Sequence, residues 1–519
     1  MLRQSGPYIT DEELEAAYKK AISKEYERKH GYTNIEDRLD CRLFPNFNIF
    51  FDGTGNNLNI SPNNKSNIAR LFMARRDSNP VYDENFYRYI TGVGTPYKPK
   101  DNPEVGEDKG GAAGLGTGKG GEMRLQDALL YIEKRLNEKY TGAAIPHVKM
   151  IDVNIFGFSR GATLARAFVH KLLNERCEVE GYDVFWTLPS YGNRLPLRIN
   201  FLGLFDTVAS VGWPGGHWSW ASELRIPNTV NRCVQLVAAH ELRKAFPLDS
   251  IAFQGSYPSN SMEVIYPGVH SDIGGGYFPD EQGRSEEYSR ITLREMYLEA
   301  IKANVPIRPI SSIRNDKKLA NEFYPSSVEV IDKYHNYISN IDQSAKSITE
   351  GIMAHRPVFF KWRSDVENND QTRLLGSFKD EVNCDQCLAT PEAKERRERN
   401  EQQWKLAEMK SSEEQSKELI AEHKRLVKQV EFMRNPFTTR GHETEPRDQT
   451  DYEKLILSAW DNSEGLQVEL SDFFENYLHD SVAAFHYWPC SLYDQRGIFM
   501  HKAEEMAQNQ PPIDEGVSV

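Results

Sequence analysis

The chain has few cysteines for its length, six in 519 residues. Low cysteine usage is typical of a protein made in a reducing cytoplasm, where disulfides do not persist. Only Cys384 and Cys387 are closely spaced, and one C-x-x-C without a second such pair or a nearby histidine pair is a weak zinc signal. We interpret it as a surface loop with two thiols, and we expect neither a metal nor a cofactor.

Long apolar runs and an excess of basic charge are also missing. The sequence contains no run of about eighteen consecutive apolar residues, so it predicts no membrane-spanning helix. Residues 1–30 are polar and charged, so we expect synthesis in the cytoplasm without a cleavable signal peptide. The net charge of -13 argues against nucleic-acid binding, which needs a dense basic surface. It also leaves apolar contact as the expected route to a lipid surface.

The sequence does contain an apolar strand that runs into Gly-x-Ser-x-Gly and then into a helical pattern, at residues 153–169. This order predicts a nucleophile elbow, the tight turn that places a serine at the edge of an α/β-hydrolase sheet. Ser159 is the predicted nucleophile. Gly157 and Gly161 flank it where a side chain would crowd the turn.

Two further apolar segments end in residues that a serine nucleophile requires. Residues 197–205 predict a buried strand followed by Asp206, and residues 262–269 predict another followed by His270. Catalytic groups of parallel α/β sheets gather beyond the carboxyl ends of the strands, and the order Ser, Asp, His is that of the α/β-hydrolases. We therefore predict a catalytic triad. The non-catalytic alternatives are that Asp206 caps the next segment and that His270 is an ordinary loop histidine.

An earlier loop is a candidate for the oxyanion hole, the N–H groups that stabilise negative charge on the attacked carbonyl oxygen. Residues 46–51 predict a strand, and residues 52–57 predict a turn. In this fold one N–H comes from the residue after the serine, here Arg160, and one from such a loop, here Gly53 or Thr54. Asp52 is expected to orient the loop. A simple tight turn is the alternative.

Four motifs carry a resemblance to a known family. They are Phe-Asp-Gly-Thr-Gly-Asn at 51–56, Gly-Phe-Ser-Arg-Gly-Ala at 157–162, Phe-Asp-Thr-Val at 205–208 and Gly-Val-His-Ser-Asp-Ile-Gly-Gly-Gly-Tyr at 268–277. With them the chain resembles the type VI secretion phospholipase effectors, from about residue 44 to residue 277. The segment 240–248 is a fifth shared element, and residues 479–481 are a weaker one. His240, Asp272 and His479 are therefore candidate supporting residues, and His479 is the rival to His270 as the base.

The resemblance implies an activity and a setting. It implies a phospholipase of A type that hydrolyses membrane phospholipids and is delivered by a type VI apparatus into the periplasm of a target bacterium. The implied partners are a secretion spike protein and a cognate immunity protein. A carboxylesterase or other ester hydrolase of the same fold, and a non-catalytic scaffold that binds a partner, remain alternatives.

The patterning also predicts how the chain is organised. We expect an α/β-hydrolase fold with a mainly parallel sheet and a large, mostly helical insertion. The predicted parts are an N-terminal helical extension (1–40), the catalytic core (41–280), a helical insertion that acts as a lid or binds a partner (281–465), and a segment that returns to the core (466–519). The glycine-rich residues 101–121 predict a mobile loop near the mouth of the site, and residues 435–450 a linker or exposed loop.

Overall fold

The computed structural model of the protein describes twelve stretches of the chain. They are residues 1–30, 42–60, 63–76, 84–111, 119–140, 147–188, 193–212, 216–378, 411–440, 443–464, 466–483 and 496–501. The Cys384/Cys387 pair lies outside these residues, as does part of the glycine-rich loop.

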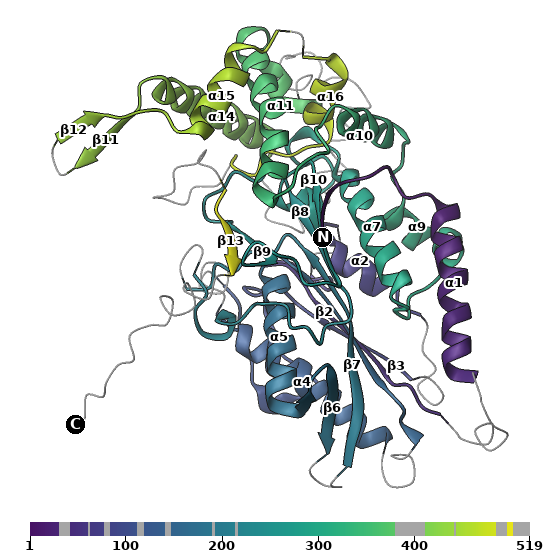
Figure 1. The fold of residues 1–519 in the computed structure, drawn as a ribbon. Coiled ribbons are helices and arrows are strands. Elements are labelled where there is room, and N and C mark those ends of the chain that lie inside the picture. The colour runs from purple at the N-terminus through teal and green to yellow at the C-terminus, as the bar shows by residue number, and fades with distance from the viewer. Residues whose placement is uncertain are drawn as a thin grey trace, which may run out of the picture.

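A long, mainly parallel sheet runs through the molecule (Figure 1). Its strands follow the order β1-β10-β8-β7-β4-β2-β3, and every pairing along this path is parallel. Their bounds are β1 Leu2–Gln4, β10 Ser261–Tyr266, β8 Cys233–Ala238, β7 Asn193–Phe205, β4 Ile151–Phe158, β2 Asn46–Phe51 and β3 Asn85–Ile90. Strands β5 (Cys177–Glu180) and β6 (Asp183–Leu188) extend β7 with antiparallel pairing.

Helices cover both faces of this sheet. Alternate residues of a strand point to opposite faces, so Ile49 and Phe51 of β2 pack with α4 (Gly121–Lys139) and α5 (Arg160–Arg176). Phe50, between them, packs on the other side with α2 (Asn67–Met73) and α7 (Ser289–Lys302). Strands buried on both faces are continuous apolar runs, which is why they were visible in the sequence. The predicted α/β fold with a mainly parallel sheet is confirmed.

The N-terminal segment contributes a strand as well as a helix. Strand β1 pairs with β10 at the edge of the sheet, which the polar sequence of this segment did not indicate. Helix α1 (Asp11–His30) packs on α7, where Asp11 accepts a hydrogen bond from Arg294 at 2.6 Å. The segment predicted as a helical extension is thus joined to the sheet through its first residues.

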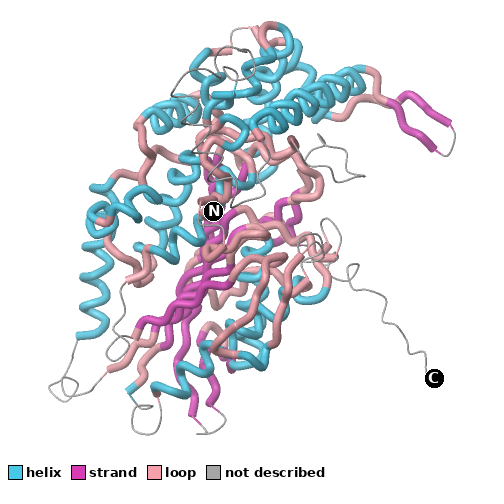
Figure 2. Tube along the Cα trace, turned by 180° about the vertical axis from the view of Figure 1, so that it is seen from behind, coloured by secondary structure: helices cyan, strands magenta, loops and turns pink. Residues whose placement is uncertain are grey.

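The region after residue 280 is mostly helical. Its helices between residues 289 and 323 lie beside α1 and α2, and those between residues 329 and 476 lie mainly beyond one end of the sheet (Figures 1 and 2). Its helices are α8 Ile310–Asn315, α9 Lys317–Phe323, α10 Glu329–Ser339, α11 Ile348–Asn368, α14 Ser412–Arg434, α15 Asp451–Asp461 and α16 Val468–Asn476. Helices α14 and α15 each begin with a capping box, formed by Ser411 with Glu414 and by Thr450 with Glu453. Helix α7 packs on the sheet itself, against β7 and β8, and α11 contacts the edge of the sheet at β1 and β10.

Two short features were not expected from the sequence. Residues 435–450, predicted as a linker or loop, contain an antiparallel hairpin of β11 (Phe437–Arg440) and β12 (Glu443–Pro446), which projects from the helical region. Its polar, threonine-rich strands lack the apolar alternation that marks a buried strand. Near the end of the chain, β13 (Ile498–His501) pairs in parallel with β9 (Leu248–Phe253).

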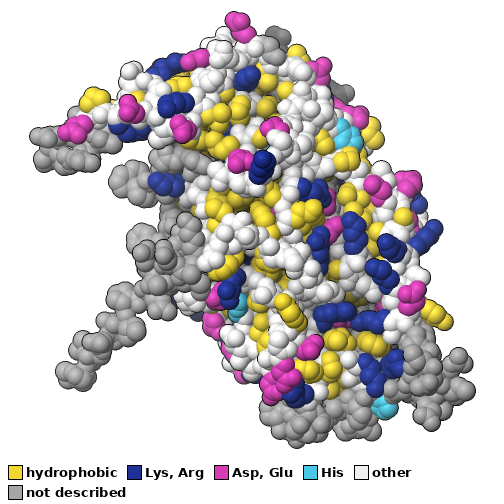
Figure 3. Space-filling view, viewed as in Figure 1, with side chains coloured by type: hydrophobic (Ala, Val, Ile, Leu, Met, Phe, Trp, Pro, Cys, Tyr) yellow, Lys and Arg dark blue, Asp and Glu magenta, His cyan; other side chains and the backbone are white. Residues whose placement is uncertain are grey.

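The surface has no dominant charge on the face shown in Figure 3, where acidic and basic side chains lie among apolar ones. A bilayer-crossing helix is absent from the described residues, since none of their helices combines sufficient length with sufficient apolar character.

Candidate active site

Ser159 stands on the turn between β4 and α5. Its backbone has φ 58° and ψ -128°, a conformation that non-glycine residues rarely adopt. The turn is held by a hydrogen bond from Ser159 N–H to the carbonyl oxygen of Phe205, 3.0 Å long, at the end of β7. A strained serine on a sharp strand-to-helix turn is the geometry of a nucleophile elbow.

Close backbone contacts explain the two glycines of the turn. A Cβ on Gly157 would lie 2.3 Å from the carbonyl oxygen of Gly161. A Cβ on Gly161 would lie 2.3 Å from the carbonyl oxygen of Asp52, at the end of β2. The elbow therefore packs directly against the loop that follows β2, and only glycine fits at either position.

Asp206 and His270 are joined by a hydrogen bond. Asp206 follows β7 with a φ of 39°, and His270 is the first residue of α6 (His270–Gly274). His270 Nδ1 donates to Asp206 Oδ2 at 2.6 Å. The ring of His270 lies between the rings of Phe158 and Phe246, with centroids 4.7 and 5.3 Å away.

The other ring nitrogen of His270, Nε2, is not the one bonded to Asp206. Nε2 is buried and has no hydrogen-bond partner among the described residues, so it is not bonded to Ser159 Oγ. Ser159 is nevertheless close to the His270–Asp206 pair in the fold. The residue before it, Phe158, contacts the His270 ring. Its own N–H bonds Phe205, the residue before Asp206. Catalytic hydrogen bonds are often long in an unliganded site and shorten when substrate binds.

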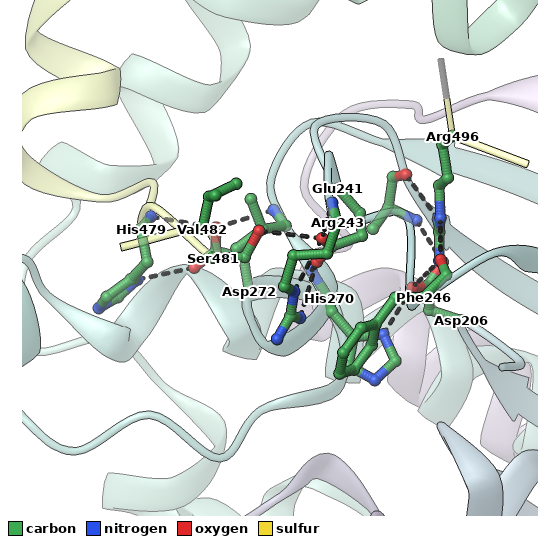
Figure 4. A network of polar contacts seen from close by, with 12 residues as sticks. Asp206, Glu241, Arg243, Phe246, His270, Asp272, His479, Ser481, Val482 and Arg496 are labelled. Atoms are coloured by element: carbon green, nitrogen blue, oxygen red, sulfur yellow. Dashed lines mark hydrogen bonds and ion pairs between the residues drawn. The ribbon is translucent and has the colours of Figure 1, made fainter. Parts of the chain in front are cut away.

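Arg496 donates two further hydrogen bonds to Asp206, and the side chains of Arg496 and Asp206 are fully buried (Figure 4). Nη1 donates to Oδ1 at 2.9 Å and Nη2 to Oδ2 at 2.7 Å. Burial alone would raise the pKa of Asp206, but the charge of Arg496 and the bond from His270 outweigh it, so the pKa is lowered. Burial lowers the pKa of His270 more than Asp206 raises it. Asp206 is thus ionised and His270 neutral at neutral pH.

A second ion pair lies on the backbone side of His270. Glu241 accepts the His270 backbone N–H at 3.3 Å and binds Arg243 through both carboxylate oxygens. Burial opposes ionisation of Glu241, yet Arg243 lowers its pKa to about 2. Ser481 also donates to Glu241, at 3.0 Å. The loop that carries His270 is therefore held by charged, buried partners.

His479 belongs to a separate histidine–aspartate pair (Figure 4). Its Nδ1 donates to Asp272 Oδ1 at 2.7 Å, and its ring stacks on Tyr277 with centroids 3.8 Å apart. Asp272 Oδ2 also accepts the backbone N–H of Val269, so this pair holds the start of α6. His479 lies after the end of α16, which stops at Asn476.

His240 lies in another buried chain of hydrogen bonds. Its Nδ1 accepts the backbone N–H of Gly268, and its Nε2 contacts Tyr337 OH, which in turn contacts His355 Nδ1. His355 Nε2 continues the chain to Gln4 Oε1 at 2.9 Å. This chain ties the loop before His270 to α10, α11 and β1.

The candidate oxyanion loop lies against the elbow. Asp52 is buried and accepts hydrogen bonds from the Gly53 backbone N–H at 2.7 Å and from the side chains of Ser66 and Tyr89. Burial raises its pKa. Arg160 Nε donates to Thr54 Oγ1 at 2.8 Å, which ties the loop to the first residue of α5. The Gly53 N–H is thus already used by Asp52.

Sequence reasoning missed three charged residues of this site. Glu241 and Arg243 lie in the 240–248 element, where only His240 was considered. Arg496 lies near the end of the chain, between Gln495 and Gly497, and nothing in its local sequence indicates that it reaches Asp206. Its role depends on a contact 290 residues away along the chain.

The parallel sheet, the elbow and the loops at its carboxyl edge define an α/β-hydrolase. Residues 46–177 and 187–299 match the family model "T6SS, Phospholipase effector Tle1-like, catalytic domain". Through these segments, a little under half of the chain, the protein is similar to the Tle1-like phospholipase effectors of the type VI secretion system.

Comparisons with solved structures and curated proteins add little about activity. A crystal structure of an uncharacterized protein from Pseudomonas aeruginosa has a TM-score of 0.67 at 20% identity, covering 96% of this chain and 85% of that one. This likeness shows the shared fold alone. A structure of the Tle1 effector bound to the VgrG spike from the type 6 secretion system has a TM-score of 0.38 at 19% identity, covering 61% of this chain and 84% of that one. No curated protein sequence matches the chain.

Proposed function

We propose that the protein is a serine-dependent phospholipase of A type that hydrolyses acyl esters of membrane phospholipids. The observation that carries this proposal is Ser159 in a strained elbow beside a buried His270–Asp206 pair. Similarity to the catalytic domain of a phospholipase effector family supports the choice of substrate class. We further propose export through a type VI apparatus with a spike protein, action in the periplasm of a target bacterium, and inhibition by a cognate immunity protein.

The proposed reaction is a two-step acyl transfer. His270 Nε2 takes the proton of Ser159 Oγ, which attacks the ester carbonyl, and the alcohol leaves with the proton that His270 returns. Asp206 holds the imidazole so that Nε2 faces the serine and stabilises its charged form. Water then attacks the acyl-enzyme, again through His270, and releases the fatty acid.

The negative charge of each tetrahedral intermediate needs two N–H donors. We propose the backbone N–H of Arg160, at the start of α5, where the helix dipole also favours negative charge. For the second we propose Thr54 rather than Gly53, because Gly53 N–H donates to Asp52. The hydrogen bond between the side chains of Arg160 and Thr54 holds the two backbone N–H donors in a fixed relative position.

Access to the site requires a conformational change. Ser159 and His270 each expose 4% of their surface, too little for a phospholipid acyl chain to reach the serine. We propose that the site opens when the protein meets a lipid surface, as lids do in many enzymes of this kind.

The substrate class is tested by comparing purified protein on phospholipid vesicles and on short soluble esters. The proposal expects release of fatty acid and lysophospholipid, with much slower turnover of soluble esters. Fast turnover of soluble esters with no attack on vesicles would instead identify a carboxylesterase. No turnover of either substrate by folded protein would favour a partner-binding scaffold.

A further inference from the structure

We propose that Arg496 is a positioning residue of the active site, which fixes the carboxylate of Asp206 and sets the protonation of His270. The inference rests on the proposed function, since it assigns a role within the same triad. It concerns a residue that the chain brings from near its C-terminal end to the catalytic acid.

The first argument is geometric. Arg496 places two N–H groups on the two oxygens of Asp206, the fork geometry in which guanidinium binds carboxylate most specifically. Among the described residues, only His270 Nδ1 and the Ala238 backbone N–H also bond this carboxylate. Arg496 therefore decides the plane of the carboxylate and, with it, the direction in which Oδ2 meets His270.

Arg496 also holds the other side of the imidazole. Its Nε donates to the carbonyl oxygen of Phe246 at 2.8 Å, and the Phe246 ring packs edge-on against His270. Its Nη1 donates to the carbonyl oxygen of Ala238 at 3.1 Å. The guanidinium of Arg496 thus bonds the last residue of β8, the loop before β9 and the catalytic acid Asp206.

The position of Arg496 is fixed by the strand that follows it. Leu248 N–H donates to the carbonyl oxygen of Gly497 at 2.8 Å, and β13 continues this pairing along β9. Phe499 packs edge-on against His217, which is bonded to Asp249 of β9. The position of Arg496 is therefore fixed by the pairing of β13 with β9.

The second argument is electrostatic. Two carboxylates bond His270, Asp206 from the end of β7 and Glu241 from after β8. Each is paired with an arginine, Asp206 with Arg496 and Glu241 with Arg243. Arg496 offsets the negative charge of Asp206, so the imidazolium form of His270 is stabilised less than it would be by Asp206 alone. His270 is kept neutral, as a base requires, to a lower pH.

The test uses the full-length protein in the presence of phospholipid vesicles, at whose surface the site is proposed to open, and a fluorophosphonate probe, which needs no knowledge of the lipid substrate. Ser159 Oγ attacks phosphorus, fluoride leaves and His270 takes the serine proton. The rate of labelling is measured against pH for wild type, Arg496→Met, Arg496→Lys and Arg294→Met. Arg294 is the matched control, because it is equally buried and pairs with Asp11 but contacts no residue of the site in the described structure.

Arg496→Met should label at least about tenfold more slowly at neutral pH, with its acid limb moved up by about one pH unit as His270 becomes easier to protonate. Arg496→Lys should keep the acid limb of wild type but label several-fold more slowly, since a point charge cannot replace the fork. Arg294→Met should reproduce the wild-type profile. A merely structural role would slow labelling without moving the limb.

The inference is overturned if Arg496→Met shows the wild-type profile, or if it slows labelling at every pH by one factor with the limb unmoved. If Arg496→Met does not fold, Arg496→Lys decides, and a wild-type rate in that variant contradicts the role. Failure of the proposed function looks different: wild-type protein would not be labelled at Ser159 at all.

Discussion

At the residue scale, the proposed nucleophile and the proposed acid share an unusual backbone conformation. Ser159 and Asp206 both have positive φ values, 58° and 39°, which cost of order 1–3 kcal/mol each in a non-glycine residue. Each is held by a backbone hydrogen bond to a neighbouring strand, from Ser159 N to Phe205 O and from Asp206 N to Leu236 O. The sheet thus stabilises two strained residues side by side, which favours a shared catalytic role over two independent turns.

Single-residue variants show which histidine is the base. His270→Ala and Asp206→Asn should each lower turnover by roughly 10⁴, because the first removes the base and the second holds the wrong tautomer. His479→Ala should cost distinctly less, since it loosens Asp272 and the start of α6 while Asp206 and His270 remain joined. Steady-state turnover of the three variants, with circular dichroism as the control for folding, makes the comparison.

The opposite order would reverse the assignment. If His479→Ala were inactive and His270→Ala retained most of its turnover, the pair of His479 and Asp272 would be the catalytic one.

At the scale of elements, the elbow depends on the contact between the start of α5 and the end of β2. Gly161→Ala should lower both the melting temperature and the activity, because its Cβ would meet the carbonyl oxygens of Asp52 and Phe51 at 2.3 and 2.4 Å. Gly6→Ala is the matched control, since its Cβ would come no closer than 3.7 Å to a side-chain atom of Arg3. Thermal melts and labelling rates of both variants check this. Equal melting temperatures and rates would show that the close packing is not required.

The elements also show what the sequence could and could not predict. Strands β4, β7 and β10 were found with small errors at their ends, because strands buried on both faces are long apolar runs. Asp206 and His270 were predicted as site residues because each follows such a strand, Asp206 directly after β7 and His270 a short way after the end of β10 at Tyr266. Strand β1, the β11–β12 hairpin and β13 are short or polar, so their local patterns carry no strand signal. Arg496 was missed for the same reason, since only the docking of β13 brings it to Asp206.

At the scale of the whole molecule, buried neutral histidines tie stability to pH. His240 and His355 share one hydrogen-bond chain through Tyr337, and burial lowers the pKa of His355 to about 3. An unfolded histidine titrates near 6.5, so the unfolded state binds more protons between these values and stability falls as pH falls. Each such histidine costs up to about 2 kcal/mol between pH 6.5 and 5.

His355→Gln should therefore be less stable than wild type at pH 7 but should lose less stability on going to pH 5. Melting temperatures of both proteins at the two pH values measure this difference. An equal or steeper decline in the variant would show that His355 is not a source of the pH dependence.

Net charge predicts how the whole molecule meets lipid. With a net charge of -13, we expect contact through an apolar rim around the opened site. Turnover should rise sharply when substrate passes from monomers to aggregates. Vesicle binding should change by less than about threefold between low and physiological salt, because screening acts on charge and not on apolar burial. A collapse of vesicle binding over that range would imply a basic lipid-binding surface instead.

The most direct test of the central claim is the release of fatty acid and lysophospholipid from phospholipid vesicles by wild-type protein and by Ser159→Ala. Alanine fits the elbow without a new contact, so the variant should keep the wild-type melting temperature. The account predicts that wild type releases both products and that Ser159→Ala releases neither above background. Equal release by a well-folded Ser159→Ala protein would contradict it.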